Sequence, residues 1–257
     1  MLKTDNNKQD FGLVSIIMPN FNSAKFINET VDSVINQSYK NWELIIVDDC
    51  STDNSIEILS QYTDDRIRLI KSEQNYGAAL SRNKAIEAAN GSWIAFLDSD
   101  DLWAYDKLEK HLSFMVDKSA VFSCTDYKVI DGDRKEVSQF SPKKDEYFYN
   151  DILKHNCIGC STAIYDAKKL GKVYMPLAEK REDFACWLEI LKRGYSVCYF
   201  HEFLAEYRVH GKSVSSKKSK MIKHQWNVYR KFERLSIFKS AYYMLHWALK
   251  GFFKYLK

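Results

Sequence analysis

Two apolar segments of this chain each lead directly into a group of aspartates, and this pairing limits the possible folds more than any other feature. The segment Leu-Ile-Ile-Val at residues 44–47 precedes Asp48 and Asp49, and Trp-Ile-Ala-Phe-Leu at residues 93–97 precedes Asp-Ser-Asp-Asp at residues 98–101. Continuous apolar runs of this length are typical of strands covered on both faces of a parallel sheet. We therefore expect the carboxylates to lie together at the carboxyl edge of that sheet, where open α/β sheets bind ligands.

Carboxylates gathered at one edge repel one another unless a cation lies between them. Their oxygen atoms are hard ligands, which favour Mg²⁺ or Mn²⁺. A divalent cation held at that edge is suited to binding a diphosphate. The sequence thus predicts a metal-dependent site for a phosphorylated ligand.

Strand and helix signals alternate through the first half of the chain. Strands are predicted at residues 14–18, 44–47, 66–71 and 93–97, and helices at residues 26–37, 53–59 and 77–89. Such alternation predicts an α/β fold in which crossover helices join parallel strands. After Ala120 the pattern loosens, with short strands predicted at residues 121–124, 127–130 and 195–200 and a helix at residues 182–192.

The length of the chain and its cysteines bound the architecture and the compartment. At 257 residues and 46% hydrophobic, the chain can bury one sizeable core, which favours one domain with an appendage. Residues 1–11 are polar and match neither a secretory signal nor a membrane span, so we expect a cytoplasmic protein with reduced thiols. Cys157 and Cys160 have the spacing of a redox or zinc site, but one pair supplies only half of a tetrahedral zinc site.

The carboxy-terminal segment differs from the rest in charge. Residues 215–257 contain eleven Lys and Arg against the single acid Glu233, a net charge of +10, whereas the whole chain carries +4. A basic amphipathic helix with aromatic residues suits an anionic membrane surface, although packing on the protein itself or in a homodimer stays open. Charges interrupt every stretch of about 20 residues, so the segment cannot span a bilayer. The apolar residues that recur at spacings of three and four, and so share one helix face, are Leu235, Phe238, Tyr242, Leu245, Leu249, Phe252 and Leu256.

A series of short motifs resembles the glycosyltransferases of family 2, which have the GT-A fold. Each motif is weak alone, but their order and spacing over residues 13–215 are highly specific. The resemblance implies a GT-A, Rossmann-like and mostly parallel sheet flanked by helices, here with a C-terminal amphipathic helical extension. The matching blocks are residues 14–22, 48–53, 75–77 with 81–83, 98–101, Arg181-Glu182-Asp183 and Tyr207-Arg208-Val209-His210.

The resemblance also implies how the chain is divided. Residues 1–12 would be a polar tail, residues 13–214 the GT-A domain and residues 215–257 a basic aromatic extension. Within the domain, residues 13–118 would bind the nucleotide and residues 119–214 the acceptor.

The resemblance assigns a set of residues to the nucleotide-sugar donor. Carboxylates accept hydrogen bonds from a uracil N–H or a ribose hydroxyl, and a guanidinium suits diphosphate oxygens. By themselves, Asp53 would also serve as a helix cap and Arg82 as a surface helix arginine paired with Glu87 or another acid. The assigned residues are Pro19, Asn20, Phe21, Asn22, Asp48 or Asp49, Asp53, Asn75, Arg82, Asp98 and Ser99.

Metal binding and catalysis are assigned in the same way. Asp98-x-Asp100 matches the DxD motif of the family, so Asp100 and His210 are the expected ligands of Mn²⁺ or Mg²⁺, and an imidazole favours Mn²⁺. An acceptor hydroxyl needs a base to take its proton, and Asp183 is the candidate. The residues expected near the acceptor or the donor sugar are Gly159, Ser161, Thr162 and Glu182, although Glu182 and Asp183 would also suit the start of a helix.

Together these features predict an inverting, metal-dependent glycosyltransferase. It would move a sugar from a nucleotide diphosphate, with a UDP-sugar favoured, to a saccharide or lipid-linked saccharide during synthesis of a bacterial surface polysaccharide such as O-antigen or capsule. A dTDP- or GDP-sugar donor, a nucleotidyltransferase and a non-catalytic nucleotide-binding protein are the alternatives. We expect a peripheral protein on the cytoplasmic face of the inner membrane, bound through the carboxy-terminal helix, and no nucleic-acid partner.

Overall fold

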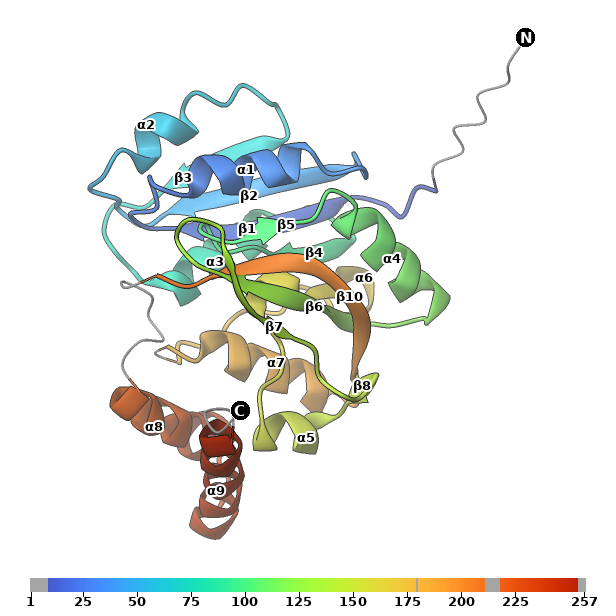
Figure 1. The fold of residues 1–257 in the computed structure, drawn as a ribbon, viewed down its shortest axis with the longest axis vertical. Helices are drawn as coiled ribbons and strands as arrows, with labels where there is room; N and C mark the ends of the chain where they lie inside the picture. The colour runs from blue at the N-terminus through green and yellow to red at the C-terminus, as the bar shows by residue number, and fades with distance from the viewer. Residues whose placement is uncertain (1–8, 179, 211–217, 254–257) are drawn as a thin grey trace.

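The structure is a computed structural model that describes residues 9–178, 180–210 and 218–253 (Figure 1). Most of the predicted polar tail and Leu256 of the predicted apolar helix face lie outside these residues. The described strands form one mixed sheet in the order β3-β2-β1-β4-β9-β6-β10-β5, with β7 paired to β6 and β8 paired to β10. The strands are β1 Val14–Asn20, β2 Trp42–Asp48, β3 Ile67–Lys71, β4 Trp93–Phe96, β5 Leu102–Trp103, β6 Phe122–Ile130, β7 Glu136–Phe140, β8 Glu146–Tyr147, β9 Ile164–Asp166 and β10 Val197–Arg208.

Helices cover both faces of this sheet. The helical segments are α1 Ile27–Ile35, α2 Ser55–Leu59, α3 Ala78–Ala88, α4 Lys107–Asp117, α5 Tyr149–Lys154, η1 Cys160–Thr162, α6 Ala167–Leu170, α7 Glu182–Lys192, α8 Lys218–Asn227, η3 Val228–Phe232 and α9 Ile237–Phe253. One core contains Ile17 and Ile45 with residues of α3 and α7, and the other contains Ile16 and Leu44 with residues of α1 and α4. Alternate residues of the same strands thus face opposite cores, which confirms that the apolar runs are buried on both sides.

The first half of the sheet is parallel. Strand β1 lies between β2 and β4, and β3 extends the sheet beyond β2. The register sets Asn20 at the end of β1 beside Asp48 at the end of β2. The carboxyl ends of these strands therefore meet at one edge, as the sequence predicts.

The second half of the sheet mixes directions. Strand β9 runs antiparallel to β4 and β6, while β10 runs parallel to β6 and antiparallel to β5. The prediction of two separate strands at residues 121–124 and 127–130 is wrong, because buried Thr125 and Asp126 stay paired with β10 and make β6 continuous. Strand β10 extends to Arg208 through the same pairing, so His210 follows directly from the sheet.

The carboxy-terminal helices pack on the α7 side of the domain through one face only. Val228 and Tyr229 are buried in the core that contains α7, and α8 and α9 lie beneath α7, with α9 beside α5 (Figure 1). On α9, Tyr243 and Met244 pack against that core. Leu235 precedes α9 and packs on the core too, so its assignment to the predicted helix face is wrong. The residues of that face that the structure shows exposed are Phe238, Tyr242, Leu245 and Leu249, joined by Ile237.

No helix in the described part of the chain combines the length and the apolar character needed to cross a bilayer.

Candidate active site

Asp48 closes the turn after β2 with a buried side chain. One carboxylate oxygen accepts hydrogen bonds from the Asn20 side chain at 2.6 Å and from the Ser51 hydroxyl at 2.5 Å. The other oxygen accepts from the Ser51 backbone N–H at 3.0 Å. Asp48 and Asn20, both predicted to bind the donor, therefore lie together, and Asp48 also fixes the shape of the turn.

Asp49 connects the end of β2 to the start of α3. Its two carboxylate oxygens accept the backbone N–H groups of Tyr76 at 2.8 Å and Gly77 at 2.7 Å. The side chain of Asn75 donates to the Asp49 carbonyl at 3.1 Å. A carboxylate at the beginning of a helix also interacts favourably with the helix dipole. Asp49 thereby holds Asn75 at the same edge of the sheet.

The turn after β1 lies against the turn after β2. Asn22 has a positive φ of 52°, which asparagine tolerates, and its side-chain oxygen accepts the Thr52 N–H at 2.7 Å. Asp53 accepts the N–H groups of Ala24 and Ser55, both at 3.0 Å. Phe21 is 50% exposed beside half-buried Pro19, so this edge presents an aromatic side chain to solvent. A planar base could stack there.

Arg82 links the two halves of the site. Its guanidinium donates to Asp98 at 2.5 Å and to Glu182 at 3.1 Å, and its side chain is only 7% exposed. The alternative of a surface arginine paired with Glu87 is therefore wrong. A single buried cation joins the acid loop after β4 to the first turn of α7.

Asp100 and His210 form the predicted metal pair. The His210 Nε2 atom lies 2.9 Å from Asp100 Oδ2. Burial, followed by the charge of Asp98, raises the pKa of Asp100, so a cation here would relieve repulsion. No set of three or more His, Cys, Asp or Glu side chains within the described residues could hold a metal ion. One carboxylate oxygen and one imidazole nitrogen nevertheless fit a divalent ion whose remaining ligands are phosphate oxygens and water.

Arg208 and Asp101 hold the acid loop in place, and the sequence assigned no role to either. The Arg208 backbone N–H donates to Asp101 at 2.8 Å, and its buried guanidinium donates to the Asp100 carbonyl at 2.8 Å and to Glu29 at 2.7 Å. Asp101 also accepts a hydrogen bond from Ser161. The position of Arg208 within the motif that ends in His210 was the signal that could have revealed it.

The segment at η1 lies directly against these acids. The Ser161 hydroxyl accepts the Asp98 N–H at 3.1 Å, and Thr162 donates to the Gly159 carbonyl at 2.7 Å. A Cβ atom on Gly159 would lie 3.2 Å from the ring of Tyr127, so a side chain there would displace that ring. Ser99, within the acid loop, accepts a hydrogen bond from Thr30 through its carbonyl at 3.2 Å.

None of the six cysteines, Cys157 and Cys160 included, forms a disulfide.

Glu182 and Asp183 begin α7 and have different surroundings. Glu182 is paired with Arg82, whereas Asp183 forms no salt bridge with any residue that the structure describes. Burial, followed by the negative charge of Glu182, raises the pKa of Asp183 to about 6. A carboxylate with a raised pKa is a stronger base and is still ionised at neutral pH. Of the two acids, Asp183 is therefore better suited to accept a proton.

Comparison with known proteins identifies relatives along nearly the whole chain. The profile of Glycosyl transferase family 2 matches residues 15–172. The chain is 45% identical to the putative teichuronic acid biosynthesis glycosyltransferase TuaG of Bacillus subtilis, over 92% of this chain and 94% of TuaG. It is 37% identical to the Escherichia coli UDP-Glc:alpha-D-GlcNAc-diphosphoundecaprenol beta-1,3-glucosyltransferase WfgD, over 95% of each.

Solved structures share the fold at lower identity. The S. aureus protein TarS in complex with UDP-GlcNAc superimposes with a TM-score of 0.70 at 21% identity, covering 90% of this chain and 70% of that one. The mannosyltransferase PcManGT from Pyrobaculum calidifontis, in complex with GDP-Man and Mn²⁺, gives a TM-score of 0.67 at 19% identity, covering 91% and 70%. These likenesses confirm the predicted GT-A fold.

Proposed function

This chain belongs to glycosyl transferase family 2 and is a glycosyltransferase, and from that premise we propose that it moves a sugar from a UDP-sugar to a saccharide with inversion at the anomeric carbon. The acceptor in this proposal is a saccharide carried on a lipid, and the product contributes to a bacterial surface polysaccharide. The name of WfgD, which gives UDP-Glc as donor and a GlcNAc diphosphoundecaprenol as acceptor, supports this choice of substrates, and the name of TuaG, which gives teichuronic acid biosynthesis, supports the pathway.

One observation carries the proposal, namely the position of Arg82 between Asp98 and Glu182. Asp98 belongs to the acid loop at the edge where the carboxyl ends of β1, β2 and β4 meet, which we call the nucleotide edge, and Glu182 stands directly before Asp183. Because Arg82 contacts both carboxylates, the acids assigned to the donor and the base assigned to the acceptor are held in one cluster. An enzyme that transfers a group between two substrates requires this proximity.

The residues then have distinct roles in the proposed reaction. The acceptor hydroxyl attacks the anomeric carbon on the face opposite the diphosphate, the new C–O bond forms as the bond to the leaving phosphate oxygen breaks, and the proton passes to Asp183. Arg82 and Glu182 position Asp183, while Asn20, Phe21 and Asn22 border the base of the nucleotide. Asp48, Asp49 and Asp53 shape that edge through the turns they hold, and any direct contact with the nucleotide stays a prediction.

A divalent cation belongs to the same proposal. Asp100 and His210 would hold it, and when bound it would neutralise the charge of the departing diphosphate. The Mn²⁺ present with GDP-Man in PcManGT supports metal use in a protein of this fold.

The donor is tested with a panel of UDP-, dTDP- and GDP-sugars by measuring nucleotide release with Mn²⁺, with Mg²⁺ and with EDTA. We expect release of UDP only, and its loss with EDTA. Release of GDP or dTDP instead would show that the donor is a GDP- or dTDP-sugar, and the protein would still be a glycosyltransferase. Release of inorganic diphosphate from a nucleoside triphosphate and a sugar phosphate would favour the alternative of a nucleotidyltransferase.

We further propose that α9 binds the cytoplasmic face of the membrane. Its exposed face carries Ile237, Phe238 and Leu245, which are 61%, 88% and 59% exposed, next to exposed Lys239. Apolar side chains of this kind enter the acyl boundary, and each nearby basic residue contributes about 1 kcal/mol at an anionic surface.

Liposome sedimentation tests the membrane proposal on the complete chain. Replacing Phe238 and Leu245 by Asp should abolish binding to vesicles that contain phosphatidylglycerol, and replacing exposed Val137 by Asp serves as the control. If vesicle binding persists and sedimentation velocity detects a dimer of the wild type that the Asp variant does not form, the face is a homodimer interface instead.

A further inference from the structure

Arg181, directly before α7, is a half-buried cation without an ion pair among the described residues. Its Nε atom is buried and has no hydrogen-bond partner there. Its guanidinium makes a cation–π contact with Trp247 of α9, whose ring centre lies 5.8 Å from the Arg181 Cζ atom. Burial lowers the pKa of Arg181, and the charge of Asp183 offsets part of that effect.

The energetics leave part of the cost of burying this cation uncompensated. Burying a guanidinium costs stability, the charges of Asp183 and Glu182 offset part of that cost, and a ring at this distance compensates only a small further part. Arginine binds phosphate oxygens particularly well because its donors form a planar fork. The Nε atom itself is buried, whereas the terminal guanidinium nitrogens are not among the described atoms that are buried without a partner, so these are the donors that an oxyanion would reach.

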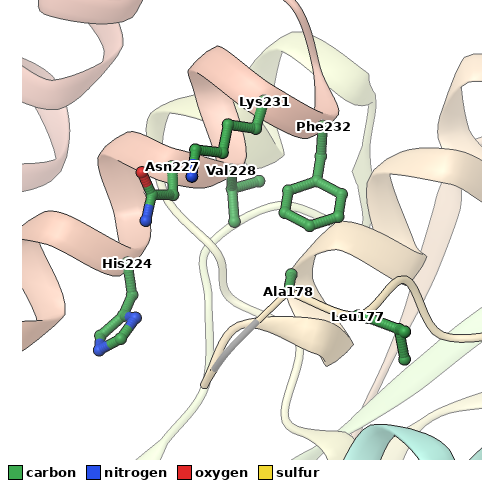
Figure 2. A pocket seen from close by; sticks show the side chains of 7 residues that line it. All are labelled: Leu177, Ala178, His224, Asn227, Val228, Lys231 and Phe232. Carbon is green, nitrogen blue, oxygen red and sulfur yellow. The ribbon is translucent and has the colours of Figure 1, made fainter.

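A cavity begins at Ala178, three residues before Arg181, on the side of the carboxy-terminal helices. The Ala178 carbonyl accepts the Arg181 backbone N–H at 3.1 Å, and Ala178 lines a cavity of about 210 Å³. Figure 2 shows His224, Asn227 and Lys231 of the α8–η3 segment on one wall and Leu177 and Ala178 on the other. The cavity combines a lysine and other polar groups with apolar Val228 and Phe232, a composition that suits a phosphate joined to an apolar chain.

We propose that Arg181 and this cavity bind the phosphate group of an acceptor whose saccharide is linked to a phosphorylated carrier. Arg181 lies two residues before Asp183, so a phosphate held there places the attached sugar within reach of the base. The proposal rests on the proposed function, because it names the class of acceptor for that reaction. It also explains why the cation lies at the junction between α7 and α9.

The first test measures anion binding independently of catalysis. Inorganic diphosphate should raise the melting temperature of the wild-type chain by several degrees, and Arg181→Met should lose at least four-fifths of that increase. Without ligand the Met variant should melt at or above the wild-type temperature, because it removes an unpaired buried charge. Arg193→Met, at the opposite end of α7, is the matched control and should keep the full response to diphosphate.

Two further arms identify the source of the anion. If vesicles of phosphatidylglycerol stabilise the wild type through Arg181 while diphosphate does not, the site binds a lipid headgroup and the proposal is overturned. Glu179, a carboxylate nearby in sequence, lies outside the described residues. If Glu179→Gln lowers the diphosphate concentration that gives half of the melting-temperature increase at least tenfold, the Glu179 side chain is the resident partner of Arg181. The proposal is then likewise overturned.

The second test uses two acceptors that differ only in charge. With the donor identified by the nucleotide-sugar panel, GlcNAc diphosphate carrying a short alkyl chain is compared with the neutral alkyl glycoside of GlcNAc. The wild type should prefer the charged acceptor in kcat/KM, and Arg181→Met should reduce the ratio of the two values about tenfold to hundredfold. Because Asp183 serves both acceptors, any change in its basicity cancels in the ratio.

The outcomes separate this inference from the function on which it rests. If no donor is cleaved and neither acceptor is glycosylated, the proposed function fails, and the melting experiment still decides whether Arg181 binds diphosphate. If both acceptors are glycosylated with a ratio that Arg181→Met leaves unchanged, only this inference fails. Arg181→Lys should recover part of the ratio, since it restores the charge without the planar fork.

Discussion

The nucleotide edge and the first turn of α7 satisfy their charged groups in opposite ways. At the nucleotide edge, both oxygens of Asp48 and both oxygens of Asp49 accept hydrogen bonds from the protein itself. At the start of α7, Asp183 has no salt bridge and Arg181 no ion pair within the described residues, although both are partly buried. Arg82 lies between the two regions and contacts each of them.

This difference suggests distinct roles for the two regions. Carboxylates that hold turns form a rigid receptacle before any ligand arrives, and such preorganisation reduces the cost of binding. Charged groups that form no ion pair among the described residues are instead available to react with, or to bind, a second substrate. This difference supports the proposal that the nucleotide edge gives the site its shape and that the start of α7 supplies the chemistry.

Replacing Asp183 by Asn tests the chemical side of the comparison and has the largest expected effect. The amide cannot accept the proton of the acceptor hydroxyl, so transfer should fall about a thousandfold while UDP affinity stays within twofold. Initial rates and calorimetric titration with UDP measure the two quantities. Glu189→Gln on the same helix is the control, and a D183N variant that transfers at the wild-type rate would remove Asp183 from the role of base.

Replacing Arg82 by Met breaks the link between the regions. Asp98 and Glu182 would be left as partly buried carboxylates without their shared cation, and we expect a loss of about 3 kcal/mol in the free energy of unfolding. Chemical denaturation with urea measures this loss. Arg68→Met, at an exposed position of β3, should change stability by less than about 0.5 kcal/mol. Equal stability of both variants would contradict the structural role of Arg82.

Replacing Asp49 by Ala tests the claim that the nucleotide edge is held by its own hydrogen bonds. The N–H groups of Tyr76 and Gly77 lose their acceptor, so unfolding should become easier by about 2 kcal/mol. Hydrogen exchange of these two amides should accelerate as well. An Asp49→Ala variant that keeps its stability but loses UDP binding would show instead that Asp49 contacts the nucleotide directly.

The pH dependence of the transfer rate tests whether Asp183 acts as the base. Asp183 must be ionised to accept a proton, and its pKa of about 6 is set by burial and Glu182 against the opposing charges of Arg181 and Arg82. The rate should be constant above about pH 7 and fall about tenfold for each pH unit below 6. A profile that stays flat to pH 4.5 in kcat/KM for the acceptor would exclude a base with this pKa.

Much of the fold was predictable because continuous apolar runs are stable only where they are buried on both sides. Residues 44–47 and 93–97 must be covered on both faces, and this places Asp48 and Asp98 at one edge. Helix α4 was not predicted, because its buried face includes Lys107 and His111, which resemble surface residues in a sequence. Their burial depends on partners far along the chain, such as the Thr162 carbonyl, 3.3 Å from the Lys107 Nζ atom.

The structure brings several of the residues that the sequence assigned to the site close together, but their individual contacts were less predictable. The order of the motifs assigned Arg82, Asp98, Glu182 and His210 to one site. In the structure, Arg82 contacts Asp98 and Glu182, and His210 contacts Asp100. Residue types do not reveal the direction of a side chain, so the inward hydrogen bonds of Asp48 and Asp49 were not foreseen. The roles of Arg208 and Arg181 depend on what surrounds them in three dimensions.

The shared guanidinium of Arg82 has a consequence for attempts to alter this enzyme by mutation. A substitution at Asp98 aimed at the choice of nucleotide also changes the partner of the side chain that supports Glu182. Changes to the two ends of the reaction should therefore be epistatic, and a double-mutant cycle between Asp98 and Glu182 should show a coupling energy of about 1 kcal/mol or more. Variants with a new donor and a new acceptor will have to be selected together.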